Sequence, residues 1–253
     1  MNVKKKPIEE VTVAIIHYNT PELTHGCIGS LVHNGGLIDR LRIVVFDNSD
    51  SKPFPEASGL TIIDNTKDQI IDFDAELAKF PSRDRSIGCA KGCEFGSAKH
   101  MMTVQKLWEL LPQGFILMES DVLITKSIAC FIKPEYSFVG YVQKAQPHNP
   151  FRIGRILPML CYMNVPLLKE HGARYYDPER TYGLLPGGRQ NRNNWYDTGS
   201  VLLEDVLNKR PNLKGLHEDI RPYVIHYGSA SWQNNDESTH LRWLKEHEYI
   251  FRT

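Results

Sequence analysis

The fold is decided by a stretch near the N-terminus, Val11-Thr12-Val13-Ala14-Ile15-Ile16-His17-Tyr18-Asn19. Its first part is almost continuously apolar and rich in β-branched side chains, and polar residues end it. A short apolar run of this kind predicts a strand that is buried on both faces, as in parallel sheets. Residues 41–46 form a second such run, which ends in Asp47-Asn48-Ser49. Both predicted strands therefore lead into polar side chains.

A helix is predicted between these two strands. Thr20 and Pro21 are typical of a helix N-cap and of the first helical position, and Asn34-Gly35-Gly36 is typical of a helix end. A strand, a helix and a strand make a βαβ unit, whose strands are parallel and joined by a right-handed crossover. Ligands of open parallel sheets bind beyond the carboxyl ends of the strands. The polar residues that follow both strands are therefore candidates for a binding site.

The rest of the chain continues to alternate between predicted strands and helices. Strands are predicted at residues 60–64, 115–118, 137–142 and 223–226, and helices at residues 87–111, 165–171 and 198–208. Loops are predicted at the Pro-rich residues 144–158 and at the polar residues 186–194. Because no repeat or linker divides the chain, we expect a single α/β domain over residues 1–253. Its central sheet should be mostly parallel and flanked by helices.

The composition argues against several classes of protein. The chain has 253 residues, and its 30 Lys and Arg balance its 30 Asp and Glu, which argues against a protein that coats nucleic acid. Five cysteines with scattered spacing argue against a disulfide framework and favour a reducing cytoplasm. No stretch approaches the ~18 apolar residues of a membrane-spanning helix. The basic start, Lys4-Lys5-Lys6, is expected to be a solvated tail, with peripheral contact to the inner face of a membrane as the alternative.

The segment Glu119-Ser120-Asp121 is the strongest candidate for chemistry, because it directly follows the buried run at residues 115–118. Carboxylates at that point should face the crevice beyond the edge of the sheet. Mg²⁺ and Mn²⁺ prefer oxygen ligands and commonly bind through one or two carboxylates together with substrate phosphates. The segment therefore suggests a divalent metal site, and a simple turn cap at Asp121 is the alternative.

Three further polar residues each have a functional and a structural interpretation. Asp47 can accept hydrogen bonds from a nucleotide base or ribose, or it can form an Asx turn. His226 can bind a metal through a neutral imidazole, or it can be structural. Asp197 can be a general base, or it can be the N-cap of the helix that follows it. We expect Asp47, Asp121 and His226 to meet around a divalent cation at one edge of a parallel sheet.

Taken in order, these motifs resemble the GT-A glycosyltransferases, especially the inverting family two and its bacterial relatives. The first strand with Tyr18-Asn19, the second with Asp47-Asn48-Ser49, and Glu119-Ser120-Asp121 are similar to that family's first strand, its Asp-Asn-Ser signature and its Asp-x-Asp motif. Together they cover roughly the first half of the chain. The resemblance implies a nucleotide-sugar-binding half at residues 1–125 and an acceptor-binding and catalytic half at residues 126–253.

The resemblance also implies roles for individual residues. Glu119, Asp121 and His226 would hold a Mn²⁺ or Mg²⁺ ion that bridges the donor diphosphate. Asp197 would be the catalytic base, although Tyr196-Asp197 stands where the family has a Glu-Asp pair. Tyr176-Asp177 is similar to the family's aromatic-Asp segment in the acceptor half. The implied donor-binding residues are His17, Tyr18, Asn19, Asp47, Lys99, His100 and Ser120, of which Lys99 or His100 would be the basic residue against the diphosphate.

The function implied by this resemblance is transfer of a sugar from a nucleotide-sugar donor, with a UDP-sugar as the first expectation. The acceptor would be the hydroxyl of a glycan or a lipid-linked sugar, as in bacterial-type polysaccharide synthesis. A cation that stabilises the leaving diphosphate and a carboxylate that deprotonates the acceptor would give a single displacement with inversion. The alternatives are a metal-dependent hydrolase, a sugar nucleotidyltransferase and an inactive sugar-binding module. The nucleotidyltransferase is disfavoured, because no Gly-rich loop follows the first strand.

Overall fold

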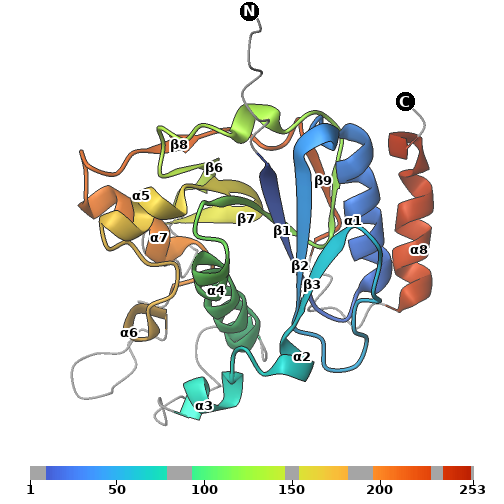
Figure 1. The fold of residues 1–253 in the computed structure, drawn as a ribbon, viewed down its shortest axis with the longest axis horizontal. Coiled ribbons are helices and arrows are strands. Elements are labelled where there is room, and N and C mark those ends of the chain that lie inside the picture. The colour runs from blue at the N-terminus through green and yellow to red at the C-terminus, as the bar shows by residue number, and fades with distance from the viewer. Residues whose placement is uncertain (1–9, 79–92, 146–153, 182–195, 229–235, 252–253) are drawn as a thin grey trace, which may run out of the picture.

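The computed structural model describes residues 10–78, 93–145, 154–181, 196–228 and 236–251 (Figure 1). The strands are β1 (Val11–His17), β2 (Leu41–Asp47), β3 (Leu60–Asp64), β4 (Phe115–Glu119), β5 (Val122–Ile124), β6 (Phe138–Gln143), β7 (Arg155–Met163), β8 (Gly215–His217) and β9 (Val224–His226). The α-helices are α1 (Pro21–Asn34), α2 (Asn65–Asp68), α3 (Phe73–Ala78), α4 (Cys93–Leu110), α5 (Val165–Glu170), α6 (Pro178–Thr181), α7 (Ser200–Asn208) and α8 (Glu237–Glu246). Short 3-10 helices cover Ile38–Arg40, Ala129–Phe131 and Glu248–Phe251.

The centre of the structure is a seven-stranded sheet with the order β3-β2-β1-β4-β7-β6-β8. The strands β1, β2, β3 and β4 pair in parallel, β7 is antiparallel to both β4 and β6, and β8 is parallel to β6. A separate two-stranded sheet pairs β5 with β9 in antiparallel fashion. The prediction of an α/β fold with a mostly parallel central sheet is therefore confirmed.

Helices cover both faces of the central sheet, with α1 and α8 on one side and α4, α5 and α7 on the other (Figure 1). Successive residues of a strand face opposite sides, so each parallel strand contributes to both cores. Ala14 and Leu117 pack in the core that contains Trp108 of α4. Val13 and Met118 pack in the core on the α1 side. The strands that end at the candidate site are thus fixed from above and below by apolar packing.

The structure differs from the sequence prediction at residues 144–158, which were expected to form a loop. The long strand β7 begins inside this region, at Arg155, and pairs with β6 from Gln143↔Arg155 onwards. Pro158 lies within β7 and has no N–H to donate, and the β6–β7 pairing is irregular between the pairs at Ile156 and Cys161. The internal proline made residues 155–158 look like part of a loop. The strand β7 nevertheless forms, because it pairs with β4 on one side and with β6 on the other.

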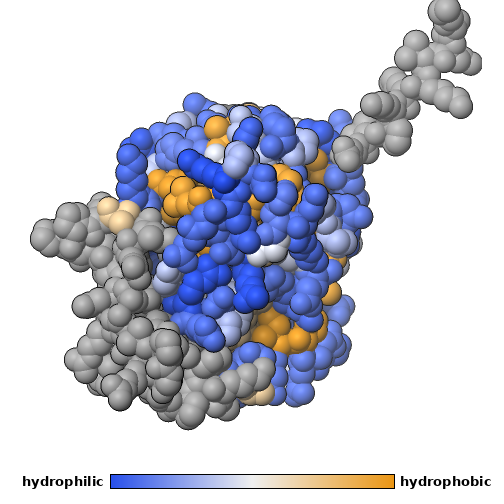
Figure 2. Space-filling view, turned by 90° about the vertical axis from the view of Figure 1, so that its left-hand side faces the viewer, coloured by the Kyte–Doolittle hydropathy of each residue, from blue (hydrophilic) through white to orange (hydrophobic). Residues whose placement is uncertain are grey.

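The described surface is mostly hydrophilic on the face that Figure 2 shows, with separate small hydrophobic patches. The exposed large apolar residues lie on different helices: Val32, Leu110, Leu207, Leu241 and Tyr249. Scattered exposed apolar residues of this kind are normal on a folded protein. Within the described ranges, no helix combines the length and the apolar character that crossing a membrane requires.

Replacing Trp108 by Ala should destabilise the fold by about 3–5 kcal/mol, because it leaves a large cavity in a closed core. Trp108 is fully buried, and its indole N–H donates to the Met163 sulfur at 3.3 Å. The free energy of unfolding from urea denaturation measures this loss. Leu110→Ala is the matched control, since Leu110 belongs to the same helix and is 41% exposed. A loss of less than about 1 kcal/mol in Trp108→Ala would contradict the packing described here.

Candidate metal centre and its surroundings

The carboxyl ends of β1, β2 and β4 meet at one edge of the central sheet. In the observed register, His17 lies beside Asp47, and Ile16 lies beside Glu119. The chain leaves β4 at Glu119, turns through Ser120 and Asp121, and enters β5. This edge is where ligands of open α/β sheets bind.

Three side chains gather at the end of β4, namely Glu119, Asp121 and His226. One ligand atom of each lies within 4.8 Å of the others. The His226 Nε2 atom is 3.3 Å from an Asp121 carboxylate oxygen and 3.5 Å from a Glu119 carboxylate oxygen. His226 reaches this point because β9 pairs with β5, which sets Val122 opposite His226. The hydrogen bond from the Tyr227 N–H to the Asp121 carbonyl, at 2.9 Å, extends that pairing.

This group places two carboxylates, those of Glu119 and Asp121, close to each other and to the His226 ring. Burial, and then the neighbouring Asp121 charge, raise the pKa of Glu119 to about 7. Burial lowers the pKa of His226, but its hydrogen bond to Asp121 and the nearby carboxylates outweigh that effect, so the net shift is upward. Two carboxylates and an imidazole that lie close together are a set of ligands that suits a divalent cation such as Mn²⁺ or Mg²⁺. The residues present therefore fit the metal that the sequence suggested.

Asp197 lies three residues before the start of α7 at Ser200, and its carboxylate is already engaged; the N-cap of α7 is Gly199, not Asp197. It forms an ion pair with Arg155 and accepts the Thr198 N–H at 2.7 Å. The Asp197 carboxylate is near enough to Glu119 to raise its pKa, and Arg155 lowers the pKa of both Glu119 and His226. The Arg155–Asp197 pair therefore borders the group of Glu119, Asp121 and His226, which we call the metal group.

Arg155 was not among the predicted site residues. The residue stands in a segment that was expected to be a loop, and no local motif marks it. Its position depends on strand pairing: the Arg155 Nε donates to the Gln143 side-chain oxygen at 2.7 Å, and these two residues are partners in the β6–β7 register. Because β7 runs antiparallel to β4, its first residue extends past the carboxyl end of β4. Only the sheet topology reveals this guanidinium as part of the site.

Asp47 lies at the same edge of the sheet but outside the metal group, contrary to our expectation that it would meet Asp121 and His226 there. Its two carboxylate oxygens accept the backbone N–H groups of Ser49, at 2.8 Å, and Phe54, at 2.6 Å. The Asp47 side chain is buried. This is the Asx-turn arrangement that the sequence left open, in which the carboxylate shapes the loop after β2.

The polar residues at the end of β1 and directly after it contact that same loop. The buried His17 ring contacts the Thr24 hydroxyl at 2.7 Å and the Lys52 carbonyl at 3.1 Å. The Tyr18 hydroxyl donates to Asp50 at 2.8 Å, and the Asn19 amide donates to the same carboxylate at 2.5 Å. The loops after β1 and β2 are therefore fastened to each other by side chains for which we predicted donor contacts.

Lys99, His100 and Ser120 complete the predicted donor set. The Lys99 ammonium lies 5.3 Å from the centre of the Phe73 ring. The His100 Nδ1 atom is 2.8 Å from the Thr198 hydroxyl, and burial lowers the pKa of His100 to about 4. A ring with that pKa is neutral near pH 7, so His100 is poorly suited to the role of a cation against a diphosphate. Ser120 lies in the turn between Glu119 and Asp121.

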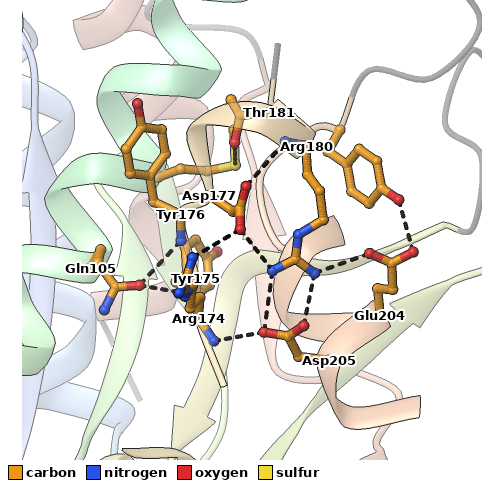
Figure 3. A network of polar contacts seen from close by, with 11 residues as sticks. Gln105, Arg174, Tyr175, Tyr176, Asp177, Arg180, Thr181, Glu204 and Asp205 are labelled. Carbon is orange, nitrogen blue, oxygen red and sulfur yellow. Dashed lines mark hydrogen bonds and ion pairs between the residues drawn. The ribbon is translucent and has the colours of Figure 1, made fainter. Parts of the chain in front are cut away.

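A network of ion pairs supports the segment that carries Asp197 (Figure 3). Arg180 of α6 binds Glu204 at 3.0 Å and Asp205 at 2.7 Å, both on α7, and it also contacts Asp177. Glu204 in addition accepts the Tyr196 hydroxyl at 2.8 Å. Asp177, which resembles an acceptor-side residue, is thus part of the framework that joins α6 to α7. Through Glu204, the network holds Tyr196 in place, and Asp197 is the next residue along the chain.

The mostly parallel central sheet, with helices on both faces, gives this chain the GT-A fold, as the sequence predicted. No family model and no curated protein matches the sequence. The galactosyltransferase LgtC, solved in complex with donor and acceptor sugar analogs, has a similar structure. It is 12% identical, with a TM-score of 0.51 over 83% of this chain and 74% of that one, and an active-site mutant of LgtC gives the same values. Mouse xyloside xylosyltransferase 1 is 11% identical, with a TM-score of 0.47 over 83% of this chain and 86% of that one. At these identities, the likeness to LgtC establishes the fold alone.

Replacing Asp121 by Asn should weaken Mn²⁺ binding at least as much as the loss of an outer-shell partner does, which is about 10–100-fold. The amide keeps the size of the side chain but removes its charge. Isothermal titration with Mn²⁺ alone measures the change. Asp219→Asn is the control, because Asp219 is an exposed carboxylate that pairs with Arg221 outside the metal group. Equal Mn²⁺ affinity in Asp121→Asn and in the unmodified protein would exclude this group as the metal site.

Proposed function

We propose that this protein is a glycosyltransferase, which moves a sugar from a nucleotide-sugar donor to an acceptor hydroxyl and depends on a divalent cation. The observation that carries the proposal is the Glu119, Asp121 and His226 group at the carboxyl edge of β4, in a chain with the GT-A fold. LgtC, which shares the fold, was solved with donor and acceptor sugar analogs. We propose a UDP-sugar as the first donor to test, and a glycan or lipid-linked sugar of bacterial-type polysaccharide synthesis as the acceptor.

The chemical difficulty in this reaction is the negative charge that develops on the departing nucleoside diphosphate. A divalent ion held by Glu119, Asp121 and His226 would act as a Lewis acid toward that charge. Arg155 offers a second positive charge from the protein itself, and Gln143 and Asp197 fix its guanidinium. An arginine presents several N–H donors in a plane that matches phosphate oxygens. We therefore assign the diphosphate contact to Arg155 rather than to Lys99 or His100.

Asp197 remains our proposed base for the acceptor hydroxyl. It is a buried carboxylate beside Glu119, Asp121 and His226, and a carboxylate can accept the proton of a hydroxyl. With Asp197 in this role, the sugar is transferred in one displacement and its anomeric configuration inverts. If Asp197 serves only to hold Arg155, its replacement should affect donor binding instead of the acceptor step.

A transfer assay tests the proposal as a whole. Thermal shifts with nucleoside diphosphates, with and without Mn²⁺, should first identify the nucleotide, because a matched ligand stabilises the native state. The matching nucleotide-sugar should then be turned over in the presence of Mn²⁺ and acceptor sugars, and a chelator should abolish turnover. Proton NMR of the product should show inversion, and Asp197→Asn should lose turnover by a much larger factor than it loses donor affinity.

Three outcomes would contradict this assignment. Full turnover of the donor without an acceptor would indicate a metal-dependent hydrolase. The absence of any nucleotide-dependent shift with Mn²⁺ would favour a sugar-binding module. A product with retained configuration would remove Asp197 from the role of base.

Arg155→Ala should lower kcat by about 100-fold, the scale expected for loss of one preorganised donor to a developing charge. Arg155→Lys should recover part of that loss, because it restores the charge without the planar set of donors. Steady-state kinetics with saturating Mn²⁺ measure both variants. Arg174→Ala is the control, since Arg174 is an exposed arginine whose carboxylate partner is Asp177. An unchanged kcat in Arg155→Ala would show that the leaving group does not depend on this guanidinium.

A further inference from the structure

Of the three candidate metal ligands, His226 has the most exposed side chain, and it lies at the end of a very short strand. Its side chain is 33% exposed, compared with 10% for Asp121. It is the last residue of β9, which spans only Val224–His226 and pairs with the equally short β5. A mobile metal ligand loses conformational entropy when the metal binds, and this loss weakens binding. The metal affinity of the site therefore depends on the contacts that hold β9 in place.

Tyr227, the residue after His226, is held at two points. Its backbone N–H donates to the Asp121 carbonyl at 2.9 Å, which connects the two ligand-bearing segments directly. Its ring lies edge-on to two rings of α8: the centre of the His240 ring is 5.5 Å away at 88°, and that of Trp243 is 5.2 Å away at 85°. Residues three apart on a helix lie on the same face, so His240 and Trp243 form one aromatic surface against Tyr227.

The helix α8 is itself fixed to the body of the protein. It packs along α1, and the approach is close, since a side-chain carbon added at Gly26 of α1 would lie 2.4 Å from Leu244 of α8. The buried His240 ring reaches Glu22 of α1 at 3.4 Å. The Trp243 ring is further braced by His247, whose ring centre lies 4.7 Å away. The aromatic surface under Tyr227 is therefore anchored independently of β9.

We propose that Trp243 is a positioning residue for the metal centre, which acts through Tyr227. The Trp243 ring, together with His240, holds the Tyr227 ring and thereby fixes the backbone from which His226 and Asp121 reach the cation. The inference rests on the proposed function in one respect, that a divalent cation binds to Glu119, Asp121 and His226. It adds that the C-terminal helix, which contributes none of these ligands, determines how tightly the cation binds.

The proposal is tested by measuring Mn²⁺ affinity with the full chain, by titration with Mn²⁺ alone. Trp243→Ala should bind Mn²⁺ about 10-fold more weakly, at the lower end of the effect of outer-shell changes on metal affinity. Trp243→Phe should bind nearly as tightly as the unmodified protein, because it retains a ring against Tyr227. Leu241→Ala is the matched control on the same helix, since Leu241 is 49% exposed, and it should bind Mn²⁺ normally.

A second variant keeps the test decisive if Trp243→Ala does not fold. Tyr227→Leu retains the backbone N–H to Asp121 but removes the ring, and it should weaken Mn²⁺ binding to the same degree. In the double variant the two losses should not add, because both remove one contact. Mn²⁺ affinity that is unchanged in Trp243→Ala, or in Tyr227→Leu where only that variant folds, would overturn the inference.

The same titration separates this inference from the proposed function. If Asp121→Asn and His226→Ala lose Mn²⁺ binding while Trp243→Ala and Tyr227→Leu retain it, the metal site stands and the role of α8 is wrong. If Asp121→Asn and His226→Ala both bind Mn²⁺ normally, the metal site itself is wrong and the inference fails with it.

Discussion

The antiparallel pairing of β5 with β9 is the interaction on which the candidate metal centre depends. Glu119 and Asp121 are close in sequence, but His226 is more than a hundred residues away. The pairing of Val122 with His226 closes that distance, and the bond from Tyr227 to the Asp121 carbonyl continues the ladder by one step. Since β5 follows β4 after a single tight turn, the central sheet and the small sheet are held in a fixed relation at the point where the three candidate ligands meet.

Charge explains why these particular side chains suit one another. Burial and, after it, the charge of the neighbouring Asp121 raise the pKa of Glu119, so the two carboxylates repel each other here. Positive charge relieves that repulsion, and the chain provides some of it through Arg155, which is paired with Asp197 at the border of the group. A divalent ion would supply the rest. The same surroundings would suit a ligand that carries a diphosphate, because its negative charges would be shared between the ion and the guanidinium.

Most other polar residues at this edge of the sheet maintain the shape of the backbone. His17, Asn19 and Asp47 direct their hydrogen bonds to the loops after β1 and β2. The ion pairs around Arg180 secure α6 to α7 near Asp197. If the site holds a metal and a nucleotide-sugar, as proposed, it benefits from loops that are already ordered, because less ordering is then required upon binding.

The amino-acid sequence by itself determined the βαβ unit, the fold class and the segment Glu119-Ser120-Asp121. Local sequence patterns predict these features: apolar runs at residues 11–16 and 41–46, a helix start at Pro21, and polar residues where buried strands end. The tertiary structure alone decided which of the polar residues come together at the end of β4. Asp47 and His226 both follow predicted strands, yet the loop of Asp47 satisfies its carboxylate, whereas strand pairing delivers His226 to Asp121. The position of Arg155 was equally hidden, because β7 forms through pairing with β4 and β6 despite its internal proline. The physical reason is that the hydrogen-bond partners of a polar side chain, and the register of a distant strand, depend on contacts between segments that no local pattern encodes.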